Sequence, residues 1–194
     1  SMSSIQTVSP ISGGTRTLVL NSGVIWNGKI AMPYVRPQGT FDEVPAILYG
    51  DPETAPSAWT VEDIDPACIE AKGVFAVLSG STLIVFWVEL AYLGGTVDRL
   101  RYASNSGSGW SAPATFYDAI ADPVYPLPPY GQFLHNLSVT MTAGGDVLAV
   151  FGLELGDGGG GQVCTLFFLS QAGLLGGGAR RSRVFYRKPF FPPR

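Results

Sequence analysis

Apolar residues occur along this chain in short runs that are separated by glycine, proline and small polar residues. The clearest series lies between residues 73 and 118, where four such runs occupy 74–78, 82–88, 98–103 and 114–117. Valine, isoleucine and aromatic residues are abundant in these runs, and no stretch shows the apolar period of 3.6 residues that indicates a helix. The pattern therefore predicts four short strands in a row and almost no helix.

Two weaker copies of this series flank it. The copy that follows has apolar runs at 137–142, 147–153, 163–170 and 180–186. The copy that precedes it is less complete, with strands expected at 29–35 and 44–49 and shorter ones at 17–20 and 24–26. Pro33 interrupts one of these strands, and proline fits a sheet only at an edge or a bulge. Residues 51–66 are acidic and contain prolines, so they are expected to be the least regular part of this copy.

The copies align through their second and third strands. Three apolar residues mark the second strand of each copy: Ile30, Leu83 and Leu148. The differences 49 − 30, 102 − 83 and 167 − 148 all equal 19, and they lead to three aromatic residues in the next apolar run: Tyr49, Tyr102 and Phe167. Self-similarity of this kind indicates an architecture of repeated small sheets. Chance register among the strands of an all-β protein would give the same spacing, and that alternative stays open.

We therefore predict an all-β fold of three four-stranded antiparallel sheets, with a β-sandwich as the alternative architecture. The expected segments are an N-terminal arm (1–14), three repeats (15–66, 67–121 and 135–188), a proline-rich connector (122–134) and a C-terminal tail (189–194).

Composition and charge exclude several classes of function. A chain of 194 residues forms one domain or at most two. The net charge of −3 provides no basic surface for phosphate groups, which argues against nucleic-acid binding. The longest apolar run, 83–93, contains Glu89 and is too short to span a membrane. Cys68 and Cys164 are isolated thiols that form neither a disulfide framework nor a metal site, and both are expected to be buried and free.

The segment LRYASNSGSGWSAP, which ends at Pro113, contains a characteristic turn. It resembles a degenerate Asp-box, the turn of sialidase-type (BNR-repeat) β-propellers, through Ser104, Gly107 and Trp110, with Asn105 in the region of the usual aspartate. The resemblance implies a structural turn, in which the tryptophan packs between neighbouring sheets and a short polar side chain accepts hydrogen bonds from the turn amides. It therefore concerns the fold of the chain and not its activity.

The same resemblance implies that the three sheets are propeller blades. Three blades do not close a ring, since propellers have four to eight. A homodimer would provide six blades around a two-fold axis. The segment could instead belong to a longer propeller, or the sheets could pack as a sandwich; the dimeric ring is the preferred alternative.

Catalytic motifs are absent from the sequence. Sialidases bind the substrate carboxylate with three arginines and use a tyrosine nucleophile, but this chain lacks the family's Arg-Ile-Pro motif and shows no such triad. His135 is the only histidine, and no G-x-S-x-G nucleophile elbow accompanies it. The glycine-rich segment 156–161 lacks the periodic aspartates of calcium-binding repeats. We therefore expect no catalytic residue, no metal and no cofactor.

A binding site is the better hypothesis, because aromatic rings beside carboxylates and amides suit the stacking and hydrogen bonding of a sugar. In a propeller, the loops between second and third strands gather at one rim together with the connectors between blades. The candidate ligand-binding residues in these segments are Arg36, Asp42, Glu89, Tyr92, Asp98, Tyr125, Tyr130, His135 and Glu154. Tyr125 and Tyr130 could equally pack against the proline-rich connector, and Glu89 and Glu154 could both cap strand ends.

The sequence thus favours a non-catalytic module that binds a glycan or a cell-surface partner, such as an extracellular lectin or a phage-tail component. A structural assembly protein of a virion or extracellular complex is the alternative, and a sialidase-like glycoside hydrolase is a weaker one. We expect a homo-oligomer, with a dimer preferred, and a location in the extracellular space or on the virion surface.

Overall fold

The computed structural model describes residues 23–38, 43–90, 99–118, 132–141, 147–156, 162–171 and 181–186. These residues form an all-β structure in which the only helical element is one short 3-10 turn, η1 (Pro56–Ala58). The predicted N-terminal arm, the strand at 17–20 and the C-terminal tail lie outside the described residues.

Within the described residues, twelve strands form three antiparallel sheets of four strands each. Sheet 1 contains β1 (Val24–Trp26), β2 (Lys29–Pro37), β3 (Glu43–Gly50) and β4 (Thr60–Asp63). Sheet 2 contains β5 (Ala71–Ser79), β6 (Thr82–Glu89), β7 (Arg99–Asn105) and β8 (Ala114–Asp118). Sheet 3 contains β9 (Gln132–Met141), β10 (Val147–Gly156), β11 (Gln162–Gln171) and β12 (Arg181–Tyr186). In each sheet the strands follow one another in chain order, so every sheet is a simple meander.

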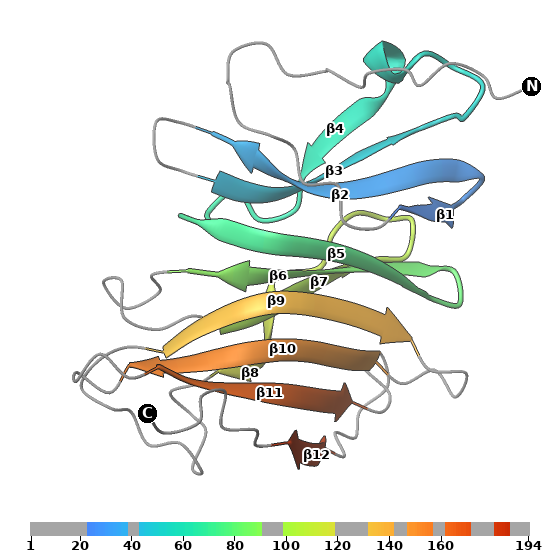
Figure 1. Ribbon diagram of the computed structural model, residues 1–194. Coiled ribbons are helices and arrows are strands. Elements are labelled where there is room, and N and C mark those ends of the chain that lie inside the picture. Colours follow the sequence, from blue (N-terminus) through green and yellow to red (C-terminus); the bar gives the residue numbers. More distant parts are fainter. Residues whose placement is uncertain are drawn as a thin grey trace, which may run out of the picture.

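The three sheets are stacked face to face, with sheet 2 in the middle (Figure 1). The alternation of side chains along β6 shows how this stacking arises, because successive residues of a strand point to opposite faces. Leu83, Val85 and Trp87 pack toward sheet 1, whereas Ile84 and Phe86 pack toward sheet 3. Both faces of β6 are therefore apolar, and its sequence is a nearly continuous hydrophobic run.

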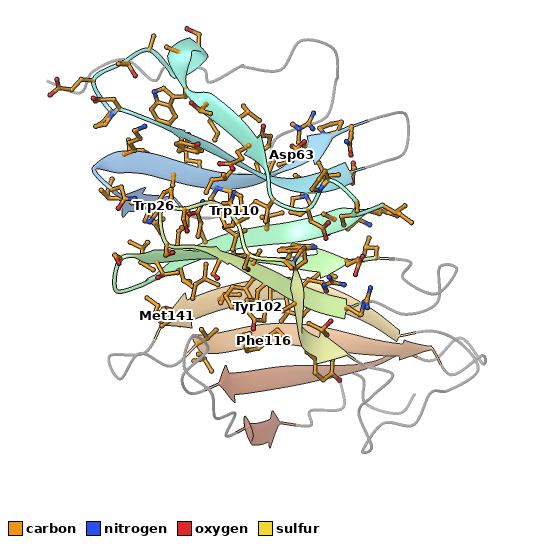
Figure 2. The ribbon with its side chains drawn as sticks, turned by 180° about the vertical axis from the view of Figure 1, so that it is seen from behind. Trp26, Asp63, Tyr102, Trp110, Phe116 and Met141 are labelled. Atoms are coloured by element: carbon orange, nitrogen blue, oxygen red, sulfur yellow. The ribbon has the colours of Figure 1, made fainter. Side chains whose placement is uncertain are left out.

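Two apolar seams hold the stack together. The seam between sheets 1 and 2 contains buried residues from both sheets and from the segment 64–70 that joins them: Trp26, Ala31, Val44, Ile47, Ile64, Cys68, Ala71, Val74, Ala76, Leu83, Val85, Trp87 and Ala103. The seam between sheets 2 and 3 is richer in aromatic rings, and Phe86 packs against Tyr102 at 5.6 Å and edge-on against Phe116 at 5.3 Å between ring centroids. Figure 2 shows Tyr102, Phe116 and Met141 together in this second seam. Burial of this apolar surface is the main stabilising contribution to the stack.

The repeat alignment agrees with the structure in sheets 1 and 2. Tyr49 and Tyr102 both lie on the third strand of their sheet and pack toward the next sheet in the chain. Their partners differ by two positions, since Tyr49 lies opposite Ala31 and Tyr102 lies opposite Phe86. A shift of two residues keeps a side chain on the same face, so the environments stay equivalent.

The alignment is wrong by one residue at Leu148. Leu83 packs toward the preceding sheet, but in β10 it is Val147 and Ala149 that pack toward the preceding sheet. Leu148 lies between them and therefore points away from sheet 2. Successive side chains of a strand point to opposite faces, so an alignment that is off by one residue assigns each side chain to the wrong face. Both faces of β10 carry apolar residues, and matching apolar residues alone therefore does not reveal this error.

Three further expectations need correction or comment. The irregular segment predicted at 51–66 contains the fourth strand of sheet 1, β4, whose polar sequence TVED gave no strand signal. The proline-rich connector predicted at 122–134 ends earlier, because β9 begins at Gln132. Pro33 lies inside β2, opposite Ile47 of β3. On its other side β2 is an edge at this point, because β1 pairs only with Lys29 to Ala31. An edge position tolerates proline, since the N–H that proline lacks has no strand to bond there.

Candidate binding site

One end of the seam between sheets 1 and 2 is crossed by the connector 64–70, which joins β4 to β5. The connector is hydrogen-bonded to both sheets through Ile64 N to Pro45 O (2.8 Å), Glu43 N to Ile69 O (3.0 Å) and Leu90 N to Glu70 O (2.8 Å). Asp65 stabilises its turn, because its backbone oxygen accepts from Cys68 N at 3.1 Å and its Oδ1 accepts from Ala67 N at 3.3 Å. This end of the stack, which we call the connector end, is therefore fixed by backbone contacts.

A group of ionisable side chains lies at the connector end of the seam between sheets 1 and 2. We call it the seam cluster, and its members are Asp65, Cys68, Glu89, Arg99 and Arg101. Glu89 and Arg99 are directly opposite each other in β6 and β7, and Arg101 is the next residue on the same face of β7. The register of this hairpin thus brings both arginines to one carboxylate.

Two guanidinium groups share one oxygen of Glu89. Oε2 accepts from Arg99 Nη2 at 2.7 Å, from Arg99 Nε at 3.1 Å and from Arg101 Nη1 at 3.2 Å. All three side chains are only 14–15 % exposed. Charge-assisted hydrogen bonds of this kind are stronger than neutral ones, and their shielding from water makes the network more rigid than a surface ion pair.

The guanidinium group of Arg101 has more hydrogen-bond donors than there are acceptors near it. Its Nη2 donates to the backbone oxygen of Pro113 at 3.3 Å, which ties the network to the start of β8. Its Nε is buried and has no partner among the described residues. A buried donor without a partner lowers the stability of the fold, so stability alone does not explain why Arg101 Nε is buried here.

The buried acid and thiol of the cluster are perturbed by their surroundings. Burial raises the pKa of the Asp65 carboxyl above its ordinary value, while the hydrogen bond from Ala67 and the charge of Arg101 act in the opposite direction. Burial also raises the pKa of the Cys68 thiol to about 12, and the charges of Glu89 and Asp65 add to this effect. Cys68 is thus a buried free thiol that stays protonated at neutral pH and is a poor nucleophile.

The pKa shift of Asp65 leads to a testable pH dependence. Because the folded state holds the Asp65 proton more tightly than the unfolded state, this group stabilises the fold below its ordinary pKa of 3.8, and that stabilisation is lost as the pH rises through the folded pKa. Asp65→Asn keeps an oxygen that can accept from Ala67 N but does not titrate. We expect the Tm of the variant, relative to wild type, to increase between about pH 3 and about pH 7. A Tm difference that is constant over this range, measured by differential scanning calorimetry, would contradict the assignment.

A second ion pair lies at the same end of sheet 1, on the face that points away from sheet 2. Arg36 donates to Asp63 through Nε (2.6 Å to Oδ1) and through Nη2 to Oδ2, and the two side chains are 27 % and 25 % exposed. Next to it, burial raises the pKa of Tyr34 to about 12. Figure 2 shows Asp63 at the end of β4. The Arg36–Asp63 pair is therefore rigid and bidentate but still accessible to solvent.

Of the residues expected to bind a ligand, the structure brings Arg36 and Glu89 into ion pairs at the connector end. His135 lies in β9 opposite Gly152, and Glu154 lies in β10 opposite Phe133 and Cys164. The remaining candidates, Asp42, Tyr92, Asp98, Tyr125 and Tyr130, lie outside the described residues. The sequence interpretation missed Asp63, the partner of Arg36, and Asp65 of the seam cluster, because both belong to the acidic segment that was expected to be irregular.

The turn that resembles an Asp-box lies at the opposite end of sheet 2. Asn105 is buried, and its Oδ1 accepts from Gly107 N at 2.8 Å and from Gly109 N at 3.3 Å. Ser104 and Ser111 close the turn through two hydrogen bonds. Trp110 packs against the seam between sheets 1 and 2, near Trp26, whose Nε1 donates to Ser81 O at 2.9 Å (Figure 2). These residues have the geometry of a structural turn and lie far from the seam cluster.

The described residues show no group of three or more His, Cys, Asp or Glu side chains arranged to hold a metal ion. Within the same part of the chain, no helix has both the length and the apolar character needed to cross a membrane.

Comparison with known proteins gives a fold relationship only. No protein-family model matches the chain, and no curated protein matches it. Among solved structures, the chain is similar to an endo-arabinase from Bacteroides thetaiotaomicron, with a TM-score of 0.56 and 9% sequence identity. The match covers 86% of this chain and 61% of the endo-arabinase. This likeness supports the all-β architecture, and the chain spans less than two thirds of the length of that protein.

Proposed function

We propose that this protein is a non-catalytic module that binds a glycan at the connector end of the stack. The observation that carries the proposal is the concentration of paired guanidinium and carboxylate groups there, in the seam cluster and in the Arg36–Asp63 pair. Sugar hydroxyl groups both donate and accept hydrogen bonds. A guanidinium group can donate to such a hydroxyl while the neighbouring carboxylate accepts from it.

The two ion pairs have different parts in this proposal. The Arg36–Asp63 pair is about a quarter exposed, so a ligand can reach it without moving the fold. The seam cluster is more deeply buried and keeps the adjacent strand ends in place through Glu89 and Arg101. A binding site needs polar groups that are held in position before the ligand arrives, and the connector 64–70 supplies this rigidity.

The fold relationship adds weaker support. The name endo-arabinase describes an enzyme that acts on a carbohydrate, and its fold resembles that of this chain. Together with the Asp-box-like turn, this favours the interpretation of the three sheets as blades of a β-propeller. A fold hosts many functions, so the glycan must be tested directly. A glycan ligand would be consistent with a location outside the cell or on a virion surface.

The proposal is tested by electrophoresis of the purified protein through native gels that contain arabinan or another neutral or acidic polysaccharide. We expect at least one polysaccharide to retard wild type. The double variant Arg36→Gln/Asp63→Asn removes both charges at once and leaves no unpaired ion, and it should lower the affinity by at least about tenfold, as expected when charged hydrogen bonds to a ligand are lost.

Lys29→Gln serves as the matched control for this experiment. Lys29 lies at the other end of β2, 5.5 Å above the ring of Tyr49, and its replacement should leave the retardation unchanged. If no polysaccharide in a broad panel retards the wild-type protein, glycan binding is wrong. If wild type releases new reducing ends from a polysaccharide, the non-catalytic part of the proposal is wrong.

A further inference from the structure

The outward-facing residues of β4 form a row along one edge of sheet 1 (Figure 1). Among the described residues, β4 pairs with β3 and with no other strand. Asp63 and Val61 lie opposite Ala46 and Leu48, so they share the face that points away from sheet 2. Trp59, two positions before Val61, packs against the same cluster as these residues. We call Trp59, Val61 and Asp63 the β4 row.

The indole ring of Trp59 is held against the backbone of the sheet. A Cβ atom at position 50 would lie 2.3 Å from Cγ and Cδ1 of Trp59, so the ring lies directly over Gly50 and a larger residue would displace it. The Nε1 of Trp59 donates to Thr54 O at 3.3 Å. The ring is still partly exposed. Sugars stack their C–H faces on aromatic rings of this kind, and a ring that is fixed in advance loses little conformational freedom on binding.

Along β4 the row changes from apolar to charged. Val61 is one of three exposed large hydrophobic side chains in the described part of the chain, with 38 % of its surface exposed. It lies between Trp59 and Asp63, and Asp63 is paired with Arg36. The middle of the outer face is already buried within the chain, so the row is confined to the edge. Apolar surface next to accessible polar groups is the combination that a sugar needs.

The charges around the row disfavour an acidic ligand. The ion pair at one end of the row has no net charge. At the other end, Asp51 and Glu53 are exposed, and they belong to the turn whose Thr54 oxygen accepts from Trp59. A carboxylate on a sugar stacked on Trp59 would be repelled by these like charges. The β4 row therefore suits an uncharged sugar better than an acidic one.

We infer that an uncharged glycan chain lies along the β4 row, with one sugar stacked on Trp59 and another hydrogen-bonded to Arg36 and Asp63. At about 3.3 Å per residue, the four steps from Trp59 to Asp63 span about 13 Å, which is longer than one sugar ring. The ligand is thus a chain of several sugars and not a single terminal sugar. This inference rests on the proposed function and adds the charge class, the length and the path of the ligand.

Native gels that contain xylan or mannan, two uncharged linear polysaccharides, test the inference, and polygalacturonate is the acidic comparison. We expect xylan or mannan to retard wild type and polygalacturonate to retard it less. The hexasaccharide of the retarding polymer should compete at a concentration at least about tenfold lower than the disaccharide, because only the longer chain reaches both ends of the row.

Variants of the row test its residues one at a time. Trp59→Ala should lower the affinity at least about tenfold, and Trp59→Phe, which keeps an aromatic ring, should restore most of it. Val61→Ser removes exposed apolar surface without disturbing a buried group, and it should weaken binding about threefold or more. Ile25→Ser is the matched control, because Ile25 is 62 % exposed but lies in β1, at the opposite edge of sheet 1. It should leave the affinity unchanged, and circular dichroism checks that each variant folds.

Failure of this inference is distinct from failure of the proposed function. If a polysaccharide retards wild type and Arg36→Gln/Asp63→Asn reduces the retardation, but Trp59→Ala and Val61→Ser do not, glycan binding stands and the path along β4 is wrong. Equal competition by the disaccharide and the hexasaccharide would overturn the inference, as would retardation by polygalacturonate that is at least as strong as that by xylan and mannan. If no polysaccharide retards wild type, both the inference and the proposed function are wrong.

Discussion

Trp87→Ala is expected to lower the free energy of unfolding by about 3–5 kcal/mol, the cost typical of deleting a buried tryptophan side chain. Trp87 is fully buried in β6 and packs in the seam between sheets 1 and 2. Its removal leaves a cavity between two sheets whose backbones are fixed by their own ladders and by the connector 64–70, so collapse of the surroundings recovers little of the loss. Urea denaturation followed by circular dichroism measures the change.

Trp87→Phe is the control that separates packing from hydrogen bonding. The Nε1–H of Trp87 is buried without a partner among the described residues, so phenylalanine removes an unsatisfied donor as well as part of the ring. We expect a loss clearly smaller than that of the alanine variant. If Trp87→Ala costs less than about 1 kcal/mol, the two sheets do not pack as described, because surface changes are typically within ~0.5 kcal/mol.

The strands of sheet 2 could be predicted from the sequence because local pattern and tertiary environment agree there. In β6 every residue from Leu83 to Val88 is buried, and the run is bounded by a Ser-Gly-Ser turn and by Glu89. The predicted strand at 82–88 matches β6 within one residue. In such a segment the propensity for β-structure, the apolar run and the turn residues all indicate the same structure.

The parts that could not be predicted depend on contacts that are distant in sequence. Strand β4 is polar and is held in the sheet by its pairing with β3 and by the ion pair of Asp63 with Arg36, 27 positions away. The face of Leu148 is decided by which side of β10 meets sheet 2, and both sides of that strand carry apolar residues. Periodicity shows that a strand exists, but it does not show which of two apolar faces is covered.

The candidate site also depends on contacts between residues that are distant in the sequence. Glu89 is a candidate ligand-binding residue that could instead cap a strand end, and the structure places it at the end of β6. Its partners there are Arg99 and Arg101 across the hairpin. Residues that act together in a site are assembled by register and by loops, and neither is visible as a motif in this chain. The expected structural turn at 104–111 agrees with the hydrogen bonds that Asn105 accepts from Gly107 and Gly109, but that expectation did not indicate the seam cluster.

Glu89→Ala is expected to destabilise the protein by about 3–5 kcal/mol, because removing one member of a buried ion-pair network leaves the charges of the others without compensation. Glu89 Oε2 is the shared acceptor of Arg99 and Arg101, and all three side chains are about 85% shielded from water, as their exposed fractions of 14–15 % show. Chemical denaturation at neutral pH and moderate salt measures the effect. A loss below about 1 kcal/mol would mean that the cluster behaves as a surface ion pair.

The triple variant Glu89→Leu/Arg99→Met/Arg101→Met distinguishes a structural role of the cluster from a role in binding. Replacing a whole buried ion network by apolar residues of similar size is often neutral or stabilising, so most of the stability lost in Glu89→Ala should return. If the cluster only joins strands, glycan binding by the triple variant should equal that of wild type. We expect binding to be weakened instead, because the charges that orient the connector end are gone while the fold persists. A triple variant that is stable and binds normally would assign the seam cluster to folding alone and leave Arg36 and Asp63 as the binding groups.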